Sequence, residues 1–240
     1  MARPKTVEEL AAALEAALGS RLVALVLYGS TARGTHVPGR SDVNTLLIVD
    51  AVDESLFAAI APPIAAWSKN GHPAPILLSA AEWRDSADVF AIEYQEMREA
   101  HRVLAGRDPW AGVTVQRADL RRQLEQELMG KLVRLRQAYA ALRDDPKRLA
   151  AVLSASMAGF LTMVRALLRL AGRTPPPTPT PAAPDALVRE AAALMGLPPD
   201  PLADLFSKRG RALKLSPGDP RAAAYLAAMA RAADYVNRLT

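Results

Sequence analysis

Four residues in a short stretch of the N-terminal half are of types that can bind a phosphorylated ligand. Gly29 and Ser30 end or follow the apolar run 21–29, while Asp42 and Asn44 stand at the start of the apolar run 43–49. Glycine lets the backbone approach a ligand closely, and a serine at the start of a helical turn adds a hydroxyl to the backbone N–H groups that point into the turn. The Gly29–Ser30 turn is therefore predicted to form a small phosphate-binding nest.

The acidic and amide residues that follow are expected to face this nest. Side chains two residues apart on a strand share a face, so Asp42 and Asn44 should point the same way. If runs 21–29 and 43–49 are neighbouring strands, that face looks toward Ser30. A carboxylate next to a phosphate nest calls for a cation between them, and Mg²⁺ typically uses one or two carboxylates together with substrate phosphates.

Two further side chains are candidates for the same chemistry. Arg33 lies in the loop between the nest and Asp42, where its planar guanidinium could clamp a phosphate, although a solvated loop arginine is an equal alternative. Glu93 is a candidate metal ligand or general base, and its alternative is a solvated or ion-paired carboxylate.

The stretches "LYGSTARG" (27–34) and "SDVNTLLIV" (41–49) resemble the nucleotidyltransferase superfamily that includes DNA polymerase β and kanamycin nucleotidyltransferase. The resemblance implies transfer of a nucleoside monophosphate from an NTP to a hydroxyl acceptor on a small molecule or a protein. It also implies a mixed sheet and divalent metal ions, Mg²⁺ or Mn²⁺. On this basis Asp42 is the main metal ligand and a catalytic residue, Asn44 is an auxiliary ligand, and Gly29 and Ser30 seat the phosphate.

The chain departs from the family pattern at two of three acidic positions. Asn44 stands where the family has its second carboxylate, and no acid occurs in the run 74–79, where a third is expected; Ser79 and Glu82 are the nearest polar residues. Two hypotheses follow. One is a nucleotidyltransferase with an altered, weak metal site. The other is a catalytically degenerate relative that binds a nucleotide, or nothing, and acts as a regulatory interaction module.

The elements that must position these residues are predicted from the apolar pattern. Runs 21–29, 43–49 and 74–79 have strand length, and helices are expected at 7–18, at both ends of 53–69 around Pro62 and Pro63, and from Ser79, which forms a capping box with Glu82. Segment 88–106 is ambiguous, and its end, 101–106, suits a short edge strand. These elements indicate an α/β or α+β unit, and the resemblance to nucleotidyltransferases implies an α+β fold with a mixed sheet and flanking helices.

The second half is predicted to be an all-α helical bundle. Leucines recur every three or four residues from Leu120 to Leu142, a second long apolar helix covers about 147–171, and two or three shorter helices follow. The Pro-rich segment 172–185 is expected to be an extended loop. We therefore predict a nucleotidyltransferase-like domain at 1–114 and a helical bundle at 115–240.

Composition limits the partners and the location. Residues 1–116 hold 10 basic and 14 acidic side chains and residues 117–240 hold 20 and 11, so the local net charges are −4 and +9. Acids alternate with bases in the second half, so nucleic acid is not an expected partner, and either a solvated helical surface or an anion-attracting face fits. The longest apolar stretch, 149–164, is too short to span a bilayer core of about 30 Å and is interpreted as a buried helix. A cytoplasmic protein without a membrane is expected, and a homodimer stays open.

Overall fold

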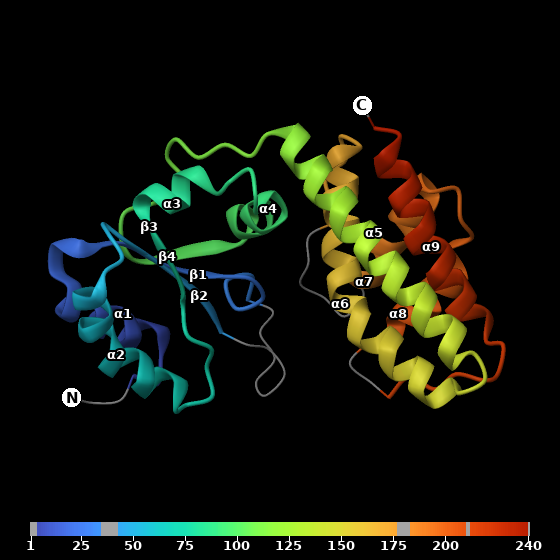
Figure 1. Cartoon of the computed structure of the whole chain (residues 1–240), viewed down its shortest axis with the longest axis horizontal. Coiled ribbons are helices and arrows are strands. Elements are labelled where there is room, and N and C mark those ends of the chain that lie inside the picture. The colour runs from blue at the N-terminus through green and yellow to red at the C-terminus, as the bar shows by residue number, and fades with distance from the viewer. Residues whose placement is uncertain (1–3, 35–42, 177–182, 210–211, 240) are drawn as a thin grey trace. The chain divides into compact units, whose positions relative to one another are not determined.

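The computed structural model describes residues 4–34, 43–176, 183–209 and 212–239. The chain divides into two compact units, Met1–Val115 and Gln116–Thr240. The first unit contains a small sheet with helices, and the second is helical (Figure 1).

The first unit alternates helices with short strands. Its elements are α1 (Val7–Leu18), β1 (Leu22–Tyr28), β2 (Asn44–Val49), α2 (Glu54–Ser68), β3 (Ile76–Ser79), α3 (Ala80–Asp85), α4 (Ala91–Glu99) and β4 (His101–Gly106). The four strands form one sheet in the order β3-β2-β1-β4. Because β1 runs antiparallel to both β2 and β4 while β2 and β3 are parallel, the sheet is mixed, as predicted.

Helices cover both faces of this sheet (Figure 1). On one face α1 and α2 pack over alternate strand residues such as Leu25, Leu47 and Val49. On the other face, which we call the α3/α4 face, Trp83 and Tyr94 pack over the intervening strand residues. Both faces of the central strands are buried, which explains why β1 and β2 read as continuous apolar runs rather than as an alternating pattern.

The predicted strands and the Ser79 capping box are confirmed, and two details of the expectation were incomplete. Helix α2 runs without interruption through Pro62 and Pro63, because its Asp53 N-cap accepts from Leu56 N (2.8 Å) and its buried side chains hold both ends against the sheet. The ambiguous segment 88–106 divides into helix α4 and edge strand β4.

The second unit is built from five helices within the described residues. They are α5 (Arg117–Leu142), α6 (Pro146–Leu170), α7 (Ala183–Leu194), α8 (Pro199–Ser207) and α9 (Pro220–Asn237). Helix α5 packs on α6 and α9, and α7 packs on α6 and α8. The last residues of the predicted loop 172–185 are helical, since α7 begins at Ala183; a proline is tolerated in a first turn, where N–H groups lack intrahelical partners. Residues 177–182 of that loop lie outside the described residues.

Helix α6 is the central helix of this bundle. By length and composition it could cross a membrane, but 56% of its apolar window is buried within the structure, as in the core helix of a globular protein. Phe160 of α6 forms an aromatic cluster with Phe206 of α8 and Tyr225 of α9. The Tyr225 hydroxyl lies 2.9 Å from Ser156 Oγ, so the polar end of the ring has a partner, and burial raises the pKa of Tyr225 to about 12.

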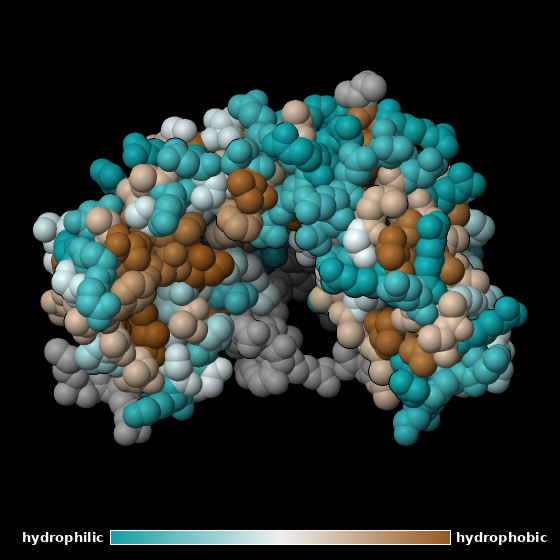
Figure 2. Space-filling model, viewed as in Figure 1, coloured by the Kyte–Doolittle hydropathy of each residue, from teal (hydrophilic) through white to brown (hydrophobic). Residues whose placement is uncertain are grey.

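Large hydrophobic side chains also reach the surface of both units. Figure 2 shows brown patches among the hydrophilic residues of each. The exposed large hydrophobic residues are Val52, Phe57, Ile76, Val89 and Phe90 in the first unit and Met129 and Val133 in the second. Scattered residues of this kind are normal on soluble proteins, so they assign no partner.

Candidate functional site

The Gly29 turn closes strand β1 in a backbone conformation that favours glycine. Gly29 has a φ of 78°, in the left-handed region. Its N–H donates to Ala100 O (3.1 Å), and its carbonyl accepts from Arg33 N (3.1 Å), which forms one helical turn after the strand. Since the Gly29 N–H is already used by Ala100, the phosphate donors of a nest here must come from the residues after Gly29.

Asn44 lies next to this turn. In the antiparallel pair of β1 and β2, Tyr28 is the register partner of Asn44, so the turn and the start of β2 share one end of the sheet. A Cβ built on Gly29 would be 3.5 Å from Asn44 Nδ2. The expectation that these two strands are neighbours is thus confirmed. Asp42 lies outside the described residues, as do His36 and Arg40, so the predicted approach of Asp42 to Ser30 stays a prediction.

The side chain of Asn44 belongs to the α3/α4 face. Residues two apart on a strand share a face, and Leu46 and Ile48 both pack in the core beneath α3 and α4. On the neighbouring strand β3, Ile76 is the register partner of Leu46, and Leu78 is the register partner of Ile48. The adjacent strand therefore offers no carboxylate on the face that Asn44 shares, in agreement with the acid-free sequence of this run.

Ser79 and Glu82, the nearest polar residues, serve the helix instead. Ser79 Oγ accepts from Glu82 N (3.2 Å), and Glu82 Oε2 accepts from Ser79 N (2.7 Å). The Ser79 N–H and hydroxyl lower the pKa of the Glu82 carboxyl. This reciprocal pair is the predicted capping box. The Glu82 carboxylate therefore has a role in starting helix α3 that requires no metal.

Arg33 is held by a carboxylate beside the turn. Its Nη2 lies 3.1 Å from Glu96 Oε2, and the side chains of Arg33 and Glu96 are 20% and 18% exposed. A phosphate must compete with Glu96 for this guanidinium. Glu93 lies in the first turn of α4, three residues before Glu96, and is exposed.

A polar row crosses three strands at this end of the sheet, and sequence reasoning missed it. Tyr28 pairs with Asn44 on one side and with His101 on the other, which brings an amide, a phenol and an imidazole into line. His101 Nδ1 lies 3.1 Å from Arg98 O, and burial raises the pKa of Tyr28. The alternation of side chains along a strand could have shown which residues of 101–106 share a face with His101. It could not have shown which residues of β1 lie beside His101, because that depends on the register between the two strands.

The described donors fit a divalent metal only in part. Within the described ranges no group of three or more His, Cys, Asp or Glu side chains could hold an ion. The Asn44 amide oxygen can act as a ligand but adds no charge, and hard cations favour anionic oxygen. The Mg²⁺ or Mn²⁺ prediction therefore depends on Asp42.

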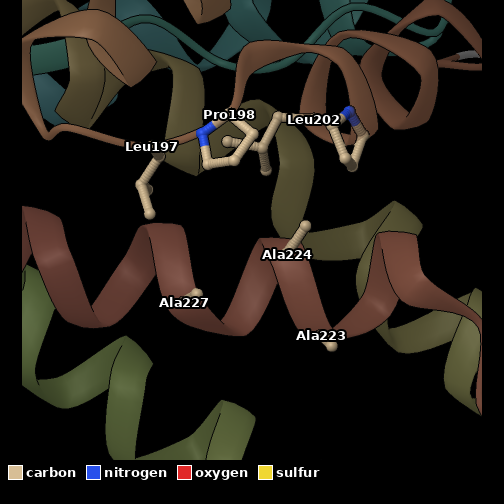
Figure 3. A pocket seen from close by; sticks show the side chains of 7 residues that line it. Leu197, Pro198, Leu202, Ala223, Ala224 and Ala227 are labelled. Atoms are coloured by element: carbon tan, nitrogen blue, oxygen red, sulfur yellow. The ribbon is translucent and has the colours of Figure 1, made fainter.

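The helical unit offers grooves of a different character. Figure 3 shows one between the N-terminal region of α8 and helix α9, with a volume of about 300 Å³. The side chains labelled there are all apolar: Leu197, Pro198, Leu202, Ala223, Ala224 and Ala227. With no ionisable group in its lining, this groove has no residue for acid–base or phosphate chemistry.

Many basic residues of the helical unit are compensated by nearby acids. Ion pairs join Arg121 to Glu125, Lys131 to Glu127, Arg189 to Asp185 and Asp200, Arg221 to Asp204 and Asp219, and Arg238 to Asp234. Such a surface favours the interpretation of a solvated helical face over that of a concentrated anion-binding face.

Comparisons with known proteins do not assign the chain to a family. No protein-family model matches it, and no significant sequence match is found among curated proteins.

Proposed function

We propose that the N-terminal unit is a nucleotidyltransferase-like domain that binds a nucleoside triphosphate at the end of the sheet where Gly29 and Asn44 meet. The observation that carries the proposal is the 3.5 Å approach between Asn44 Nδ2 and the Cβ position of Gly29, together with the Tyr28–Asn44 register. This approach supports the proposal because it brings Gly29 of the first stretch close to Asn44 of the second.

The turn supports phosphate binding through its backbone. Residues after a left-handed glycine that opens a helical turn direct their N–H groups away from the strand, which is the usual basis of phosphate nests. Ser30 supplies a hydroxyl at the same point, and the guanidinium of Arg33 provides a positive charge beside it. The triphosphate replaces Glu96 as the partner of Arg33 in this proposal.

Binding without efficient transfer is favoured over full catalysis. In-line phosphoryl transfer relies on positioning and on neutralising charge, mainly by metal ions held on carboxylates. Asn44 is neutral and the neighbouring β3 residues on its face are apolar. A regulatory or nucleotide-sensing role in the cytoplasm, where NTPs are abundant, suits such a site.

Transfer to a hydroxyl acceptor is the second candidate function. Its support is Asp42, two residues before Asn44 in the sequence, with Glu93 as a base. A divalent metal bound at Asp42 would neutralise phosphate charge.

The experiment measures unfolding in the presence of each NTP, with Mg²⁺, Mn²⁺ or EDTA. All three tryptophans, Trp67, Trp83 and Trp110, belong to the first unit, so tryptophan emission reports that unit alone. A ligand at 100 times its Kd stabilises the folded state by about 2.7 kcal/mol. We expect at least one NTP to raise the unfolding temperature. Failure of all NTPs under every metal condition refutes the proposal.

A pair of glycine variants locates the binding. Gly29→Ala should weaken NTP binding because it alters the turn. Gly71→Ala is the matched control, since Gly71 also has a positive φ (84°) and a Cβ there meets nothing within 4 Å. Equal binding by both variants would place the nucleotide elsewhere. Pyrophosphate release that is lost in Asp42→Asn would establish the transfer function instead.

A further inference from the structure

A cleft lies on the α3/α4 face, near the end of the strands opposite to the Gly29 turn. Its volume is about 370 Å³, and its lining includes Val23 of β1 and Ile48 of β2. Asn44 starts strand β2, whereas Ile48 is next to its last residue, so the cleft is separate from the Gly29 turn. Pockets that bind small molecules have volumes of about 300–1,000 Å³, so the volume of this cleft is suitable for a small ligand.

The walls of the cleft are held in place by hydrogen bonds that need no ligand. Trp83 Nε1 donates to Pro109 O (2.8 Å), which ties α3 to the loop after β4. Arg107 N donates to Val23 O (3.0 Å), and Asp108 Oδ1 accepts from Trp110 N (2.9 Å). A cleft fixed in this way loses little conformational freedom when a ligand binds.

Two guanidinium groups line this otherwise largely apolar cleft. Arg84 comes from α3 and Arg107 follows β4, while Asp108 is the one carboxylate in the lining. Arg84 Nε donates to Ala80 O (3.2 Å). The Arg107 side chain makes no hydrogen bond or ion pair within the described part of the chain. Guanidinium groups prefer planar carboxylates and phosphates, which they bind through paired N–H donors.

We propose that this cleft binds a small organic anion, with its carboxylate or phosphate head on Arg84 and Arg107 and its apolar body against Val23 and Ile48. The lining has an excess of positive charge beside an apolar floor, and that pairing matches an amphipathic anion better than it matches a free inorganic ion or a neutral hydrocarbon. The inference does not depend on nucleotide binding at the Gly29 turn.

The test compares charged and neutral probes of one shape. The whole chain is titrated with 2-naphthoate and 2-naphthyl phosphate, with 2-naphthamide as the neutral control. Affinity is measured by calorimetry, and binding is located by the NMR signal of the Trp83 indole N–H. At least one anion should bind about tenfold more tightly than the amide, because a hydrogen bond to a charged acceptor is stronger than one to a neutral acceptor. Equal affinity for the amide and both anions, or an unmoved Trp83 signal, overturns the proposal.

Variants then assign the head group. Arg84→Gln and Arg107→Gln should each weaken anion binding about tenfold by the same reasoning. Arg102→Gln is the matched control, because Arg102 is an exposed arginine of the same unit that pairs with Glu8 and does not line the cleft. If both cleft variants bind the anions as tightly as the control does, the guanidinium groups do not hold the ligand.

Discussion

Replacing Gly106 with alanine should strongly destabilise the N-terminal unit. Gly106 ends β4 with a φ of 77°, and a Cβ there would lie 2.2 Å from Val23 O and 2.8 Å from Val23 C. These are backbone atoms of the central strand β1, so they cannot move aside as a flexible side chain can. Arg107 N bonds to the same Val23 carbonyl (3.0 Å), so a shift there also disturbs the floor of the anion cleft.

The size of the effect follows from two separable costs. An alanine in the left-handed region costs about 1–2 kcal/mol. Forcing extra atoms into a packed position costs about 1–3 kcal/mol. Gly106→Ala should therefore lower the free energy of unfolding by about 2–5 kcal/mol in all.

Gly112 provides a control that isolates the clash. It has the same φ of 77°, lies in the same unit, and would place a Cβ with nothing within 4 Å. Gly112→Ala therefore carries only the backbone cost, so the two variants should differ by about 1–3 kcal/mol.

Urea unfolding followed by tryptophan emission measures this difference, since all the tryptophans lie in the first unit. With an m-value of about 1–3 kcal/mol/M the midpoints should separate by about 1 M. Coincident midpoints for Gly106→Ala and Gly112→Ala would refute the close approach of Gly106 to Val23.

Three further changes probe the charges of the same unit. Asn44→Asp should strengthen Mg²⁺ binding by adding an anionic oxygen; an unchanged calorimetric affinity would show that this side chain does not meet the metal. Glu96→Gln should tighten NTP binding, because the guanidinium of Arg33 then loses the carboxylate that pairs with it in the described part of the chain, and weaker binding would contradict that role. Hydrogen bonds from Ser55, the Leu56 N–H and Arg21 lower the pKa of Asp53 to about 2. The pKa of an aspartate in the unfolded chain is about 3.9. Since the folded-state pKa is lower, ionised Asp53 stabilises the folded state above pH 4, and this stabilisation is lost as the pH falls toward 2. The urea midpoint of the native chain should therefore approach that of Asp53→Asn over this range, and parallel curves would disprove the shift.

Much of the fold was predictable because local patterns decide it. Apolar runs of strand length marked β1, β2 and β3, and the Ser79–Glu82 spacing marked the start of α3. These signals lie within a few residues of one another. The sequence predicted helix at both ends of 53–69, perturbed in the middle by Pro62 and Pro63, whereas α2 is one continuous helix through both prolines, because packing against the sheet outweighs a local preference.

The contacts within the candidate site were harder to predict because they depend on register. Arg33 and Glu96 are 63 residues apart, and nothing near either residue specifies the other. The row from Asn44 through Tyr28 to His101 exists because Tyr28 is the register partner of Asn44 in the β1–β2 pair and of His101 in the β1–β4 pair. A shift of one residue in either pairing would send one of these side chains to the opposite face.

The charges around the Gly29 turn imply how a nucleotide must bind there. A triphosphate carries several negative charges, and the N-terminal 116 residues have a net charge of −4. The one cation placed at the turn by the described contacts, Arg33, is already neutralised by Glu96. Metal-free NTP therefore gains little attraction, whereas a magnesium complex of the NTP meets less repulsion. Affinity should rise with Mg²⁺ even if the protein itself supplies few metal ligands. For that reason metal-dependent binding alone does not identify a transferase, and pyrophosphate release that is lost in Asp42→Asn is the sharper criterion.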